Sequence, residues 1–140
     1  MNTKSAPAAP GERIPGWVAV IVIVGALLSL VGAAMSKLDP ALLTTHALTD
    51  AARVYTDYTF ARNLSVGLTL LGLLALRSRC ALAGVMTLVA LIQIFDVLDD
   101  LMRGDFMLAA GLLVFIIALL VGAQRLLGAP LWRAAAWRGA

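Results

Sequence analysis

The residues of this sequence that could carry chemistry are polar side chains set within apolar runs. Arg62 and Asn63 open one such run. Gln93, Asp96 and Asp100 follow one another on a second run, at spacings of three and four. Because a helix has about 3.6 residues per turn, these three share one helical face. Together the five side chains offer a guanidinium, two amides and two carboxylates, which can bind a polar headgroup, a proton or a cation.

The two polar groups lie at similar depths in their runs. Counted from the arginines at the opposite ends of the runs, Arg62 and Asp96 differ in depth by only about 3 Å, at the rise of 1.5 Å per residue. Arg62 and Asp96 can therefore pair, and Asn63 and Gln93 can meet one level deeper. Two interpretations stay open. Arg62 and Asp96 form a structural ion pair that reaches the nearby interface, or they line the mouth of a ligand-binding cavity.

The chain holds a single cysteine and a single histidine. Cys80 can form neither an intrachain disulfide nor a cysteine-based zinc site, and an inert thiol is the simpler interpretation. A metal site or a catalytic dyad needs partners at fixed geometry, so a lone His46 favours an ordinary surface residue. We therefore predict no metal, no cofactor and no catalytic residue, and the balance favours a protein that is not an enzyme.

Composition indicates the environment of these residues. The chain is 61% apolar and only 14% charged, whereas soluble proteins are roughly half apolar and a quarter charged. A helix needs roughly 20 mostly apolar residues to cross a bilayer core about 30 Å thick. The sequence predicts an all-α, polytopic membrane protein, a single domain over residues 1–140 with four transmembrane helices in an antiparallel bundle. The predicted spans are residues 17–35, 58–76, 81–98 and 106–124.

The first apolar run also has the marks of a signal peptide. Lys4 and Arg13 precede it, and Gly32, Ala33 and Ala34 are the small residues that a cleavage site prefers. However, the run is longer than the apolar part of a signal peptide, which has about 7 to 15 residues. We expect a retained span after a leader of residues 1–16.

Basic residues indicate the orientation in the membrane. Of the 11 lysines and arginines, more lie on the side of the two termini than on the other. Because such residues stay in the cytoplasm, the leader and the tail, residues 128–140, are predicted to be cytoplasmic, and the protein is predicted to lie in the cell membrane. The basic residues are scattered along helix ends and form no patch, so nucleic acid is not an expected partner. In the tail, Trp132 and Trp137 with their neighbouring arginines are predicted to anchor to the lipid surface.

Two further features concern assembly. The long connection over residues 37–57 has Asp39 before Pro40, a helix start, which predicts a short interfacial helix between the first two spans. A stripe of small residues on the first span predicts close contact with another helix, in this chain, in a homo-oligomer or in a partner. This stripe consists of Gly25, Ser29, Gly32 and Ser36.

Short motifs connect the chain to a family. Phe60, Arg62, Asn63 and Gly67 open the second span, and Asp96, Asp99 and Asp100 end the third. With four spans, this pattern resembles the DoxX-like group of small bacterial membrane proteins. The resemblance implies a four-helix bundle in the inner membrane of a bacterium, a link to redox or quinone-associated membrane complexes, and a cavity lined by Arg62 and Asp96. The chain departs from the pattern in its outer segment around His46 and in lacking paired cysteines.

Three functions agree with these observations. The first is binding of a lipid-like or quinone-like small molecule, or of a partner membrane protein, at the outer end of the bundle. The second is an accessory subunit of a membrane redox enzyme that uses the carboxylates of Asp96 and Asp100 as acid and base. The third is a scaffold subunit that assembles through the small-residue stripe. The sequence argues against a small multidrug exporter, because these proteins need an acidic residue deep in the first span and this span has no charge.

Overall fold

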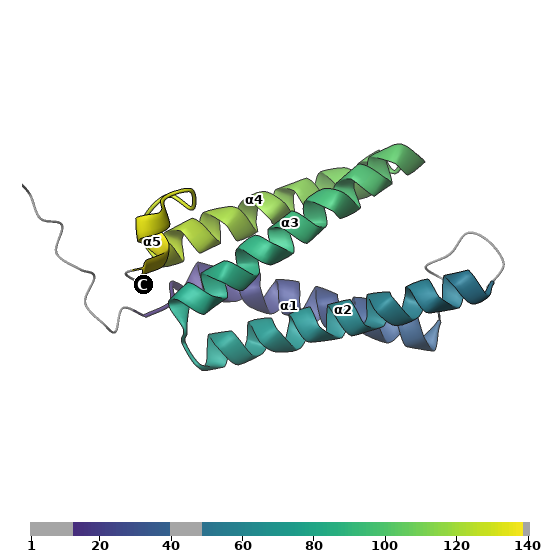
Figure 1. Cartoon of the computed structure of the whole chain (residues 1–140), viewed down its shortest axis with the longest axis horizontal. Coiled ribbons are helices and arrows are strands. Elements are labelled where there is room, and N and C mark those ends of the chain that lie inside the picture. The colour runs from purple at the N-terminus through teal and green to yellow at the C-terminus, as the bar shows by residue number, and fades with distance from the viewer. Residues whose placement is uncertain (1–12, 40–48, 139–140) are drawn as a thin grey trace, which may run out of the picture.

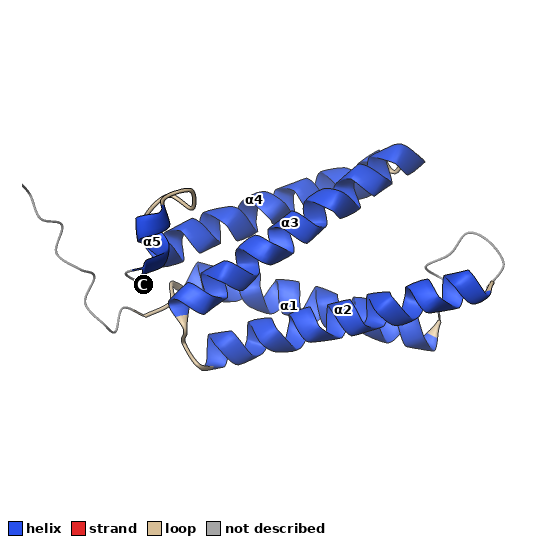
Figure 2. Ribbon diagram, in the orientation of Figure 1, coloured by secondary structure: helices blue, strands red, loops and turns tan. Residues whose placement is uncertain are grey.

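The computed structural model describes residues 13–39 and 49–138, and these residues are helical except at turns and ends (Figure 2). No strand occurs in these two segments. The prediction of an all-α fold is confirmed. The helices are α1 (Gly16–Leu38), α2 (Asp50–Ala75), α3 (Arg79–Arg103), α4 (Phe106–Leu127) and α5 (Ala134–Arg138).

Three of these helices, α1, α3 and α4, have the length and apolar composition needed to cross a membrane. The chain is therefore a multi-pass membrane protein. Each of the three extends beyond the predicted span at one or both ends. The second helix is not among them, because its first half carries several charged residues. These are Asp50, Arg53, Asp57 and Arg62.

The second helix begins eight residues before the predicted span. The Thr49 hydroxyl oxygen accepts a hydrogen bond from the Ala52 amide at 3.2 Å and caps the helix. No glycine or proline occurs between Asp50 and Val66, so nothing interrupts the helix before the apolar part. Residues 50–57, expected in a separate interfacial segment, are therefore the first turns of α2. The interfacial helix is not confirmed, and residues 40–48, with His46, lie outside the described residues.

The four long helices form two antiparallel hairpins, α1 with α2 and α3 with α4 (Figure 1). The hairpins meet where α1 begins and α4 ends, and they diverge toward the opposite end. We call the first the closed end and the second the open end. The helices are antiparallel within each hairpin, as predicted, but the two hairpins pack closely against each other over only part of their length.

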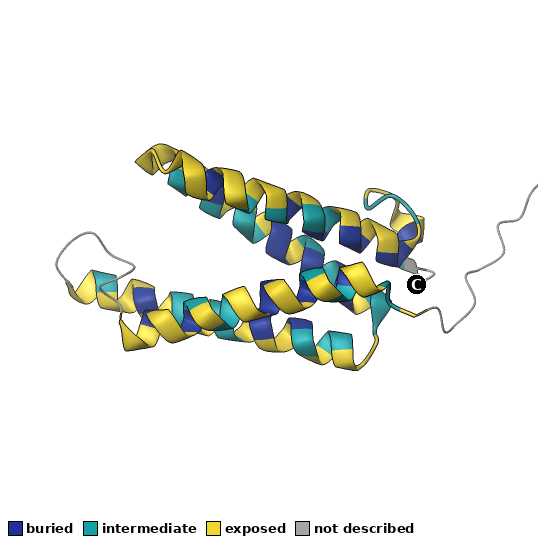
Figure 3. Ribbon diagram, turned by 180° about the vertical axis from the view of Figure 1, so that it is seen from behind, coloured by how far each residue is buried: buried dark blue, intermediate teal, exposed yellow. Residues whose placement is uncertain are grey.

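The core lies mainly in the half of the bundle nearer the closed end (Figure 3). Small residues let the helices approach there. A Cβ added at Gly122 of α4 would lie 2.6 Å from Met86 Cε, and one added at Gly25 of α1 would lie 2.7 Å from Phe115 Cζ. Lipid is as apolar as these side chains, so close packing holds such helices together. Fully buried side chains here include Val18, Val22, Leu82, Met86 and Leu119.

The short α5 folds back onto the closed end. The Trp137 indole N–H donates to the Leu131 carbonyl at 2.8 Å, and its ring lies 3.7 Å from the position of a Cβ at Gly84. Trp132, by contrast, is 81% exposed. The two tryptophans therefore have different surroundings. Trp137 packs on the protein, and Trp132 is available to the lipid surface.

Candidate functional site

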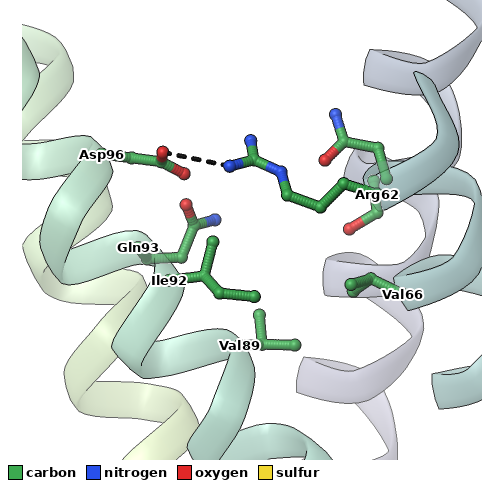
Figure 4. Close-up of a pocket in the computed structure, with 8 residues that line it drawn as sticks. Arg62, Val66, Val89, Ile92, Gln93 and Asp96 are labelled. Carbon is green, nitrogen blue, oxygen red and sulfur yellow. Dashed lines mark hydrogen bonds and ion pairs between the residues drawn. The ribbon is translucent and has the colours of Figure 1, made fainter. Parts of the chain in front are cut away.

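An ion pair connects the two hairpins where they begin to diverge. Arg62 of α2 extends toward Asp96 of α3, and its Nη1 lies 3.4 Å from Asp96 Oδ1 (Figure 4). The two side chains are 41% and 35% exposed. The structure thus brings together the two charges that the sequence placed at the same depth, and it leaves both partly open to their surroundings.

A small cavity lies beside this pair. Its volume is about 30 Å³, which is room for about one water molecule. Asp96 and Arg62 lie at its polar edge, and Val66 and Val89 lie deeper, toward the closed end (Figure 4). Four of the five predicted binding residues line the cavity. The full lining is Ser29, Arg62, Asn63, Val66, Val89, Ile92, Gln93 and Asp96.

Asn63 is directed toward the first helix. Its Nδ2 lies 2.9 Å from the position that a Cβ at Gly32 would occupy. Glycine at position 32 therefore makes room for this amide, since any larger residue would displace it. Gln93 lines the cavity from α3, so the two predicted amides approach from different helices.

Asp100, the fifth predicted residue, does not line this cavity. Its backbone carbonyl accepts the Asp105 amide at 2.9 Å and helps to end α3. Its neighbour Asp99 pairs with Arg103 on the same helix. Asp100 shares a helical face with Asp96 but lies one turn further toward the open end. The hairpins have separated there, which sequence spacing alone does not reveal.

The predicted small-residue stripe packs inside the chain. Gly25 lies against Phe115 of α4, and Gly32 lies against Asn63 of α2. The Ser36 side chain is buried, and its hydroxyl donates to the Gly32 carbonyl at 2.7 Å. Ser29 lines the cavity. In this structure, the partners of the stripe are the chain's own helices.

Sequence reasoning missed a second interhelical ion pair. Lys37 Nζ, at the end of α1, lies 2.5 Å from Asp57 Oδ1 on α2 and 5.4 Å from the centre of the Phe60 ring. Lys37 and Asp57 lie at the two ends of the connection over residues 37–57, on the same side of the membrane. This placement of opposite charges could have identified the pair. It links α1 to α2 at the open end.

The side chains of this site offer donors and acceptors of hydrogen bonds. Among the described residues, no group of three histidine, cysteine, aspartate or glutamate side chains is arranged to hold a metal ion. A guanidinium, a carboxylate and two amides around a water-sized space can donate and accept hydrogen bonds to a polar group. Comparisons with models of protein families, with curated proteins and with solved structures find no match to this chain. The resemblance to the DoxX-like group stays a prediction.

Proposed function

We propose that α2 is the fourth membrane span and that both termini lie in the cytoplasm of a bacterial cell. At 1.5 Å per residue, its 26 residues extend about 39 Å, enough for a bilayer core of about 30 Å. α2 is paired with α1, and Arg62, the one charge in the stretch from Tyr58 to Ala75, has a carboxylate partner. The predominance of basic residues on the terminal side supports the orientation.

The function that the geometry supports best is binding of an amphipathic small molecule, either lipid-like or quinone-like. The observation that carries this proposal is the Arg62–Asp96 pair, partly exposed between two hairpins within apolar helices. Charged side chains in a membrane usually face a partner or a wet cavity, because lipid solvates them poorly. A polar headgroup at the pair would supply the hydrogen bonds that lipid tails lack.

The size of the cavity limits how such a molecule binds. A space of about 30 Å³ is far below the several hundred cubic ångströms that usually enclose a small ligand. The polar group of the ligand therefore contacts Arg62, Asp96 and Gln93 at the cavity edge. Its apolar part remains in the membrane along the helices, and the bound molecule is only partly enclosed by protein.

A comparison of wild type with three purified variants tests this proposal. Wild type, Arg62→Ala, Asp96→Asn and the double variant are extracted in mild detergent, and co-purifying lipids and quinones are measured by mass spectrometry beside thermal stability. We expect both single variants to remain folded and to lose the same bound species. The control is Arg103→Ala, which removes an arginine that pairs with Asp99 on one helix and lies outside the cavity; it should retain the ligand.

The opposite result would identify a purely structural pair. In that case the single variants would lose stability, while wild type and all three variants carried the same co-purifying lipids and quinones. Equal loss of ligand in Arg103→Ala would likewise count against a specific site at Arg62 and Asp96.

A further inference from the structure

The closed end carries a second and much larger cavity. Its volume is about 420 Å³, and its lining includes Arg13, Ile14, Leu74 and Arg77. The first two residues lie just before Pro15, the N-cap of α1, and the other two belong to the end of α2 and the turn toward α3. Two arginines that are far apart in the sequence therefore border one hollow.

The apolar part of this lining is held by the core. Ile14 and Leu74 are half-buried and pack against the buried cluster of the bundle. Arg13 and Arg77 are exposed, and within residues 13–39 and 49–138 neither forms an ion pair with a carboxylate. The cavity thus combines a fixed apolar wall with two cationic side chains that no described acidic residue neutralises.

Arg77 has an unusual backbone conformation. It follows the C-cap of α2 with a φ of 54°, and the amides of Arg77 and Ser78 donate to the carbonyls of Leu74 and Leu73. This is the Schellman arrangement, in which the left-handed position is usually glycine. Helices α3 and α4 do end on glycines, Gly104 and Gly128. A side chain at the left-handed position is sterically unfavourable, and such strain is concentrated at functional sites.

We propose that this cavity binds the phosphate of an anionic phospholipid headgroup between Arg13 and Arg77. Guanidinium groups bind phosphate through paired hydrogen bonds. The N-terminus of α1 begins at Gly16 beside the cavity and has no side-chain cap, so its dipole adds positive potential. The ligand is a lipid rather than a soluble anion, because Ile14 and Leu74 provide an apolar wall beside the charge and the cavity lies where membrane spans end.

A lipid bound here would join two parts of the chain. Arg13 precedes α1, and Arg77 lies in the connection between the hairpins, so one headgroup would hold the start of α1 against that connection. The inference relies on the proposed membrane span of α2 but is independent of ligand binding at Arg62 and Asp96. Failure at one site would leave the other unaffected.

Native mass spectrometry of the full chain in detergent tests the inference. The protein is titrated with phosphatidylglycerol, with phosphatidylcholine, and with inorganic phosphate. The variants are Arg13→Gln and Arg77→Gly, with Arg125→Gln as a control that removes an exposed arginine at the same end, outside this lining. Arg77→Gly suits this test because glycine favours the left-handed conformation, so the variant should fold at least as well as wild type.

We expect wild type to bind phosphatidylglycerol more tightly than phosphatidylcholine. Each of Arg13→Gln and Arg77→Gly should weaken phosphatidylglycerol binding about fivefold, since one arginine near an anionic surface contributes about that factor. Arg125→Gln should bind as wild type does. The inference is wrong if Arg77→Gly retains full binding or if Arg125→Gln loses as much as the cavity variants. If inorganic phosphate at millimolar concentration instead competes with phosphatidylglycerol for the cavity, the ligand is a soluble anion and the lipid assignment is wrong.

Discussion

The closed and open ends of this bundle are held together by different interactions. At the closed end, α1, α3 and α4 meet around Gly122, and the Met86 side chain fills the space that a Cβ would need. At the open end the hairpins separate, and the Arg62–Asp96 pair bridges them. The first contact depends on shape, and the second depends on charge.

This difference indicates how one chain could combine a stable fold with the ligand binding that we propose. Close packing in lipid needs small residues at each crossing point, and these occur where the hairpins meet. Polar groups inside the membrane are costly, and here they lie where the hairpins part and a ligand can reach them. The closed end therefore supports the fold, and the open end is the candidate site.

The largest effect is expected from Gly122→Leu at the closed end. A leucine would overlap Met86 and Val18, and overpacking of this kind costs about 1–3 kcal/mol of unfolding free energy. The measurement is unfolding from mild detergent into dodecyl sulfate, followed by circular dichroism. Gly111→Leu is the matched control, because it lies on the same helix with nothing within 4 Å of an added Cβ. Equal losses in the two variants would contradict the packing of the closed end described here.

An intermediate effect is expected from replacing the open-end pair with leucines. Arg62→Leu or Asp96→Leu alone leaves an unpaired charge, which should cost less than the overpacking at Gly122, because the remaining side chain is partly exposed and only a charge at the membrane centre costs about 2.5–3.5 kcal/mol. The double variant leaves no charge and should recover more than half of the unfolding free energy that a single variant loses. The same unfolding titration measures all three. Simple addition of the two single losses would mean that the pair does not couple the hairpins.

The smallest effect is expected from Lys37→Gln, which breaks a pair within one hairpin. Exposed ion pairs contribute about 0.2–1 kcal/mol, and the side chains of Lys37 and Asp57 are 49% and 64% exposed. The loss should shrink at high salt, since salt screens exposed charges, and Lys37→Arg should retain the stability. A loss as large as that of Gly122→Leu would show that the open end is not held mainly by weak polar contacts.

Local sequence patterns were sufficient to predict most of the helical structure. Apolar runs located α1, α3 and α4 to within a few residues, because hydropathy and span length are local properties. The start of α2 was wrong, because a charged stretch without glycine or proline can remain helical once Thr49 caps it. Polar spacing placed Arg62 and Asp96 at one level, and the structure brings their side chains together.

The sequence by itself determined the membrane environment, the long apolar helices and the polar faces of α2 and α3. Only the tertiary structure decided that the hairpins diverge, that Asp100 lies outside the cavity, and that Arg13 and Arg77 border one hollow. Helical periodicity specifies where a side chain lies around its own axis. The distance between two helices depends on packing at every crossing, to which residues far apart in the chain contribute together.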